Sequence, residues 1–282
     1  MSKEKIAVVT DSTVCLPESL LGDMELTVMP IWLHWDGKQL RDGIDIDAPT
    51  FYQRLRRSKT LPTTSQPSAG EFIEFYRKVG EKATTIVSVL VSSMISGTVA
   101  SAQAARDALP ELDIRIVDAL SSSMGQGFSV LAALRAVAAG KSADEVVAAA
   151  EEMNHKANLL FVVDTLEFLH RGGRIGAARR WLGSALRIKP ILHFLDGKIT
   201  PLSQARTTPR AIAQVMELIQ ERVGGQQIAE AAVVDIDCPD EADKIAGHVA
   251  KRFGLDVVHR TGVSPVVGTH VGPGAIGIAF HT

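Results

Sequence analysis

Hydroxyl side chains are concentrated in short segments that stand at the ends of predicted strands. These segments are residues 11–13, 62–68 and 92–98. Hydroxyls and backbone N–H groups can solvate an oxyanion without a permanent positive charge, and a helix N-terminus adds the attraction of its dipole. Ser96, Gly97 and Thr98 directly precede a predicted helix, although the same residue types also favour ordinary caps and turns. Because several such segments occur together, the sequence favours a site for a small anion.

A glycine-rich segment, residues 268–277, carries His270 and is expected to be a loop. Its Gly272 to Gly277 portion matches the pattern GxGxxG, but only five residues follow, too few for the helix and acidic residue of a dinucleotide site. The glycines instead allow a ligand or a strand to approach the backbone closely, and His270 brings a titratable ring into that space. A lone histidine can equally be a satisfied structural residue, so both interpretations stay open.

A serine hydrolase is the enzymatic alternative. Ser96 or Thr64 could combine with His270 and with Asp11 or Asp118 in a catalytic triad, but the chain has no GxSxG elbow. Neither HExxH nor a Cys/His cluster is present, so we predict no metal site.

A basic segment spans residues 171–189. Its charged and aromatic residues are Arg171, Arg174, Arg179, Arg180, Trp181, Arg187 and Lys189. It could be a solvated helix face with Trp181 and Leu182 packed inward. It could also be a docking surface for a phosphate group, an acidic partner, an anionic membrane or nucleic acid. The formal net charge of −2 argues against nucleic acid.

The elements that must position these residues indicate an α/β fold with two domains. In the first half, strands at 6–10, 84–91 and 114–118 alternate with helical patterns, which predicts a largely parallel sheet flanked by helices. Capping boxes at Ser68 and Ser142 and alanine-rich runs at 97–109 and 125–139 predict the helices.

The second half is predicted to hold a mixed sheet with helices. Asp196-Gly197 between strands 191–195 and 198–202 indicates an antiparallel hairpin. Thr208, followed by a proline, and Asp240 are the expected helix N-caps. Further strands are expected at 159–163, 231–236, 257–259 and 276–280. We place the domains at 1–157 and 158–282, with the ligand at their junction.

Bulk properties suit a cytoplasmic protein. The 282 residues are 46% hydrophobic and 22% charged, as in ordinary globular proteins. The chain begins Met-Ser-Lys-Glu-Lys directly before a predicted strand, which leaves no room for a signal peptide, and it has no membrane-spanning apolar run. Cys15 and Cys238 are too distant in sequence for a CxxC motif and are expected to be reduced.

Taken in order, these motifs resemble the DegV family, bacterial fatty-acid-binding proteins that serve a fatty acid kinase as its acyl-carrying subunit. The resemblance spans nearly the whole chain. Its marks are Asp11-Ser12-Thr13 with Leu16-Pro17, Arg41-Asp42-Gly43, Thr64 to Ser68, Ser96-Gly97-Thr98, Arg171-Gly172-Gly173-Arg174, Lys189-Pro190 and residues 268–277.

The resemblance implies that a long-chain fatty acid lies between two α/β domains, with its carboxylate held by Thr64, Ser96 and His270. Ser65 and Ser93 are alternatives, and Gly97, Thr98 and Gly272 flank the same positions. It also implies that Arg174, or Arg171, assists the partner or handles phosphate.

On this interpretation the chain is a substrate carrier without catalytic residues or a cofactor. ATP and Mg²⁺ would be bound only by a separate kinase that resembles dihydroxyacetone kinases, and contact with a membrane would be transient. Chain length and saturation of the fatty acid are left open.

Overall fold

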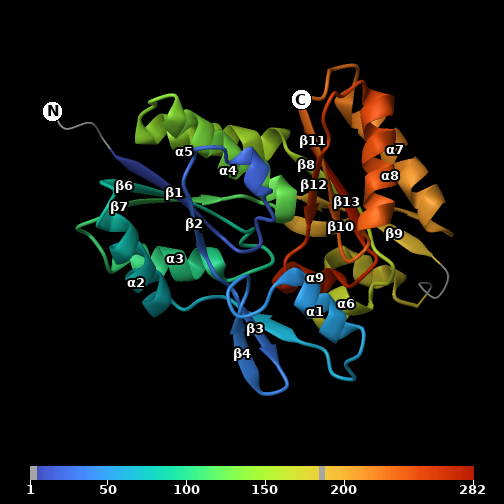
Figure 1. The fold of residues 1–282 in the computed structure, drawn as a ribbon, viewed down its shortest axis with the longest axis horizontal. Coiled ribbons are helices and arrows are strands. Elements are labelled where there is room, and N and C mark those ends of the chain that lie inside the picture. Colours follow the sequence, from blue (N-terminus) through green and yellow to red (C-terminus); the bar gives the residue numbers. More distant parts are fainter. Residues whose placement is uncertain (1–4, 184–187) are drawn as a thin grey trace.

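The first half of the chain forms a four-stranded parallel sheet. A computed structural model describes residues 5–183 and 188–282 and shows this sheet on one side of the molecule (Figure 1). The strand order is β2-β1-β6-β7, with every neighbouring pair parallel. Its strands are β1 (Ile6–Asp11), β2 (Leu26–Met29), β6 (Thr85–Leu90) and β7 (Asp113–Asp118).

Helices cover both faces of the parallel sheet because alternate strand residues point to opposite faces. Val8 of β1 packs in one apolar cluster with the two helices of one face, and Val9 packs in another cluster with those of the opposite face. The helices are α4 (Ser123–Ala138) and α5 (Ala143–Lys156) on one side, and α2 (Ala69–Gly80) and α3 (Thr98–Asp107) on the other. Both predicted capping boxes, at Ser68 and Ser142, are confirmed.

The second half forms a six-stranded mixed sheet in the order β10-β9-β8-β13-β11-β12. Only β11 and β12 pair in parallel. The strands are β8 (Asn158–Val162), β9 (Lys189–Leu195), β10 (Lys198–Ala205), β11 (Glu230–Asp235), β12 (His259–Gly262) and β13 (Ile276–His281). Helices α7 (Thr208–Val223) and α8 (Pro239–Phe253) cover its outer face (Figure 1). The predicted fold class and the Asp196-Gly197 hairpin are therefore confirmed.

A third, three-stranded antiparallel sheet was not predicted. It consists of β3 (Trp32–Trp35), β4 (Lys38–Arg41) and β5 (Thr63–Ser65). Asp36-Gly37, in the left-handed conformation between β3 and β4, is a hairpin signal of the same kind as Asp196-Gly197 and could have revealed it. Residues 62–68 were predicted only to stand at the end of a strand, but Thr63–Ser65 within them is itself a strand that pairs with β3.

Several predicted boundaries were wrong by a few residues. The N-cap of α7 is Thr207, and that of α8 is Cys238, one and two residues before the expected positions. Of the strand predicted at 257–259, only His259 lies in a strand, since β12 begins there. The supposed loop around His270 begins as helix α9 (Pro265–Val271), whose last turn holds the histidine.

Further short helices complete the fold. They are α1 (Ala48–Leu55), α6 (Glu167–Arg171) and the 3₁₀ helices η1 (Glu18–Leu20) and η2 (Gly176–Trp181). Within residues 5–183 and 188–282, no helix has both the length and the apolar character needed to cross a bilayer.

Helix α4 joins the two large sheets. Val130 of α4 packs on the parallel sheet, whereas Phe128 and Leu131 pack in the cluster that includes Leu159 and Phe161 of the mixed sheet. The first nine residues of α4, 123–131, are all buried. Because this part of the helix is enclosed on nearly all sides, its residues are small or apolar apart from Gln126. This apolar cluster contains residues from both halves of the chain, so the packing does not by itself separate two domains. The division at 157/158 therefore stays a prediction.

Candidate functional site

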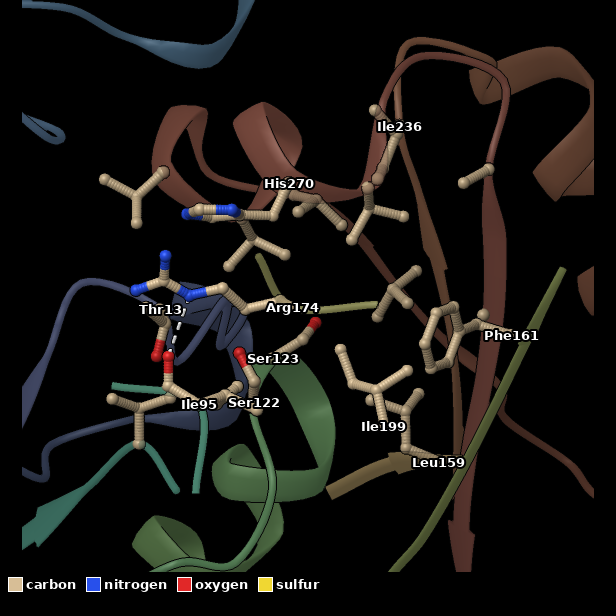
Figure 2. A pocket seen from close by; sticks show the side chains of 18 of the residues that line it. Thr13, Ile95, Ser122, Ser123, Leu159, Phe161, Arg174, Ile199, Ile236 and His270 are labelled. Carbon is tan, nitrogen blue, oxygen red and sulfur yellow. Dashed lines mark hydrogen bonds between the residues drawn. The ribbon is translucent and has the colours of Figure 1, made fainter. Parts of the chain in front are cut away.

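A cavity of about 870 Å³, part of it open to solvent, lies between the two large sheets. Figure 2 shows His270 and Arg174 together on one side of it and Leu159, Phe161 and Ile199 on the other. The apolar lining comes mostly from the mixed sheet and α9. It includes Leu159, Phe161, Phe194, Ile199, Val234, Ile236, Val263, Val266, Val267 and Val271. The cavity is therefore apolar over most of its length and polar at one end.

Thr64 and His270, which are 206 residues apart, meet at the polar end. The Thr64 hydroxyl oxygen lies 2.7 Å from Nε2 of His270, within hydrogen-bond distance. Thr64 is held by strand β5, and its neighbour Ser65 points to the opposite face, where its hydroxyl bonds to Nε2 of His34. Ser65 therefore lies outside the cavity wall, and its role as an alternative carboxylate ligand stays a prediction.

His270 is a buried, neutral ring. Burial, and secondly the charge of Arg174, lowers the pKa of His270 to about 4. Its Nδ1 atom is buried and has no hydrogen-bond partner among the described residues. A Cβ at Gly172 would lie only 2.2 Å from this nitrogen, so the glycine makes room for the ring. The imidazole can serve as a hydrogen-bonding group here but carries no charge at neutral pH.

Arg174 supplies the positive charge at this end of the cavity. Its Nε donates to the carbonyl oxygen of Ile95 at 2.9 Å (Figure 2). Its Nη1 donates to the carbonyl oxygen of Gly172 at 2.6 Å. No carboxylate of the described residues pairs with it, and burial lowers the pKa of its guanidinium. A half-buried cation whose bonds go only to neutral carbonyls attracts an anion.

The serine loop, residues 92–98, contributes fewer groups than predicted. Ser96 lines the cavity, and its hydroxyl lies 2.8 Å from that of Thr98. Thr98 is buried behind it, and Gly97 permits the close approach of Gln66, whose Nε2 would be 2.7 Å from an added Cβ. Ser93 is exposed and does not line the cavity, because its backbone N–H is tied to Asp118.

Two other predicted residues also lie outside the cavity wall. Gly272, with a φ of +82°, ends α9, and a Cβ there would lie 2.3 Å from the ring of Phe168. Arg171 is exposed and forms an ion pair with Glu167 at 2.5 Å. Of the two candidate arginines, only Arg174 reaches the cavity.

The basic segment is divided between α6 and η2 and is not one continuous helix. Lys189 is paired with Asp164, and Trp181 and Leu182 pack against the core as one interpretation expected. Arg187 lies outside the described residues.

The contacts do not assemble the hydrolase triad. Ser96 is bonded to Thr98, whereas His270 is bonded to Thr64. Asp11 accepts hydrogen bonds from Thr13 and from the backbone of Val91, and burial raises its pKa. Asp118 accepts from backbone N–H groups. Neither acid contacts His270 within the described chain, so the ring lacks the orienting carboxylate of a triad.

Four further polar residues line the cavity. Thr13 and Gln66 lie in segments noted from the sequence but received no role of their own, whereas Ser122 and Ser123 were not noted at all. The run Ser121-Ser122-Ser123 begins three positions after the last residue of strand β7, so the rule that ligands bind beyond the carboxyl ends of parallel strands could have identified it.

The fold and the cavity define an α/β protein that encloses, between its two large sheets, a site with one polar and one apolar end. The chain belongs to the DegV family, since the family model described as "Uncharacterised protein, DegV family" matches residues 5–282.

Bacterial relatives match over almost their full length. Protein DegV of Bacillus subtilis is 34% identical over 276 residues, with 98% of each chain covered. A DegV domain-containing protein of Streptomyces coelicolor is 38% identical, with 97% of each covered.

Two solved structures are also similar over 99% of each chain. A DegV family protein from Thermus thermophilus, described by its fatty acid binding, has a TM-score of 0.91 and 32% identity. DegV from Bacillus subtilis, described as a fatty acid binding protein, has a TM-score of 0.90 and 34% identity.

Proposed function

We propose that this protein binds a long-chain fatty acid and presents its carboxylate to a separate ATP-dependent fatty acid kinase. The observation that carries the proposal is the Thr64–His270 pair beside Arg174 at the polar end of an otherwise apolar cavity. The fatty acid binding of two relatives with 32% and 34% identity supports the same ligand class.

The apolar part of the cavity suits an acyl tail. About 15 methylenes, at about 0.8 kcal/mol each, give an upper limit on the order of 12 kcal/mol before the cost of ordering the tail. Two or three hydrogen bonds to a charged carboxylate, at roughly 1.5–3 kcal/mol each, would offset its desolvation. Tail burial thus gives affinity, and the polar end gives orientation.

The neutral ring of His270 orients the hydroxyl of Thr64. Because Nδ1 has no partner, the tautomer with the proton on Nε2 avoids an unpaired buried donor. Nε2–H then donates to Thr64, whose own proton is free to donate to a carboxylate oxygen. Arg174 adds the counter-charge, and Ser96 adds a further hydroxyl.

The kinase would transfer phosphate to this carboxylate, and the acyl phosphate would remain on the carrier. Nucleotide and Mg²⁺ would be held by the kinase, because the sequence has no GxxxxGK[ST] phosphate loop.

The test uses protein freed of lipid and titrated with palmitate by calorimetry, followed by ATP turnover with a fatty acid kinase. Thr64→Val, Ser96→Ala and His270→Gln should reduce kinase-coupled turnover more than palmitate affinity. Ser65→Ala is the matched control, since this hydroxyl lies on the same strand but faces away from the cavity. Absence of palmitate binding would refute the ligand, and full turnover by the triple variant would refute the assigned site.

A further inference from the structure

Gly277 lies in the part of the cavity wall that the mixed sheet forms. It belongs to β13, an inner strand of this sheet, and its neighbours Ile276 and Ile278 pack in the outer cluster with α7 and α8. Because successive residues of a strand point to opposite faces, a side chain at position 277 would point inwards, and the residue lines the cavity. Glycine weakens the interior of a strand and often marks a place where a ligand approaches the backbone closely.

Larger side chains flank Gly277 on both neighbouring strands. The glycine is paired with Val234 of β11 on one side and with Phe161 of β8 on the other. Both of these residues line the cavity, as does Leu159, and all three are buried. Gly277 is therefore a low point in the cavity wall, between bulkier apolar groups.

A methyl group at position 277 would displace these neighbours. An added Cβ would lie 2.7 Å from Cγ2 of Val234, 3.2 Å from Cδ1 of Leu159 and 3.4 Å from Cβ of Phe161. The first distance is well below the optimal separation of two carbon atoms, so the valine methyl would have to move. Since these side chains already border the cavity, the empty space beside them is the cavity itself. The missing side chain at 277 thus lets its neighbours lie close to the sheet and leaves the space above them for a ligand.

The space above Gly277 belongs to the apolar part of the cavity. Figure 2 shows Leu159 and Phe161 on the side away from His270, which meets Thr64 at the polar end. A carboxylate bound at the polar end would therefore place methylenes of the tail above Gly277.

We infer that Gly277 determines how long an acyl tail the cavity accepts. The inference rests on the proposed function and concerns the tail alone, so the carboxylate contacts are unaffected. Each methylene that enters the cavity should raise the affinity about 4-fold, the equivalent of about 0.8 kcal/mol. A tail that exceeds the available space gains no affinity from its last carbons and crowds the wall. The longest tail that still gains affinity is the length limit, which Gly277 sets together with Val234.

The test titrates lipid-free protein by calorimetry with saturated fatty acids from laurate to arachidate, lengthened one carbon at a time. Gly277→Ala reduces the space, whereas Val234→Ala removes two methyl groups from the wall and enlarges it. The double variant combines both changes. Gly262→Ala is the matched control, because Gly262 is also a strand glycine but lies outside the cavity wall, with no described atom within 4 Å of an added Cβ.

We expect Gly277→Ala to lower the length limit by about one or two carbons and Val234→Ala to raise it by about two. The double variant should return close to the limit of the unaltered protein, because the added methyl occupies space that the valine methyls leave. Gly262→Ala should leave the limit unchanged. All four variants should bind tails shorter than their limit as tightly as the unaltered protein does.

The same length limit in Gly277→Ala and Val234→Ala as in the unaltered protein would overturn the inference and leave the proposed function standing. So would an equal shift in Gly262→Ala and Gly277→Ala. If Gly277→Ala does not fold, the limit of Val234→Ala decides the question. If no fatty acid of the series binds to the unaltered protein, the proposed ligand is refuted and the inference falls with it.

Discussion

The hydroxyl of Ser92 donates to the carbonyl oxygen of Gly197 at 2.7 Å, joining the serine loop to the turn of the β9–β10 hairpin. A second bond, from Arg174 to the carbonyl of Ile95, reaches the same loop. The loop that places Ser96 in the cavity is thus held from the second half of the chain by two hydrogen bonds.

Gly197→Ala should disturb this junction. A Cβ there would lie 2.5 Å from the Ser92 hydroxyl, and the φ of +76° is unfavourable for alanine. Gly37→Ala is the matched control, because Gly37 is also the second residue of an Asp-Gly hairpin turn, has a φ of +75°, and has nothing within 4 Å of an added Cβ.

Both substitutions should cost about 1 kcal/mol of unfolding free energy through the backbone. Gly197→Ala should cost a further 1–3 kcal/mol, roughly, through the clash. Urea unfolding measures the free energy of unfolding of the two variants. If both lose the same amount relative to the unaltered protein, the contact between residue 197 and Ser92 does not contribute to stability.

His270 should make the protein sensitive to mild acid. Its pKa is about 4 in the folded state against 6.5 for a free histidine, so the unfolded state binds the proton first. Stability should therefore fall as the pH drops from 6.5 towards 4, by at most roughly 3 kcal/mol. The free energy of unfolding of His270→Gln should therefore fall less between pH 7.5 and pH 4.5 than that of the unaltered protein. A variant with the same pH dependence as the unaltered protein would contradict the assignment.

Asp42 should have the opposite pH dependence. Burial is the largest cause that raises its pKa from 3.8 to about 7, so the folded state retains the proton longer than the unfolded state does. The contribution of Asp42 to the free energy of unfolding should therefore fall as the pH rises from about 4 to 7, and it should stay constant above pH 7.

Asp42→Asn cannot titrate and can still accept from Ser12, so relative to the unaltered protein it should gain stability over this window, on the order of 4 kcal/mol. Thermal unfolding at pH 5 and pH 8 measures the gain. A difference that is the same at both pH values would show that Asp42 is ionised throughout.

Local signals in the sequence were sufficient for most elements. The capping boxes at Ser68 and Ser142 and the Asp196-Gly197 turn were read correctly, because each depends on residues a few positions apart. The strand at Thr63–Ser65 was missed because three residues of polar side chains carry no periodic pattern, and their partner strand β3 lies some thirty residues away.

The sequence by itself determined the two α/β halves, the hydroxyl-bearing segments and the small set of candidates that included Thr64, Ser96, His270 and Arg174. Only the tertiary structure decided which of them meet. Strand alternation turns Thr64 towards His270 and Ser65 away, and burial together with the charge of Arg174 makes the ring neutral. These outcomes depend on side-chain direction and on packing between residues about two hundred positions apart, which no local pattern encodes.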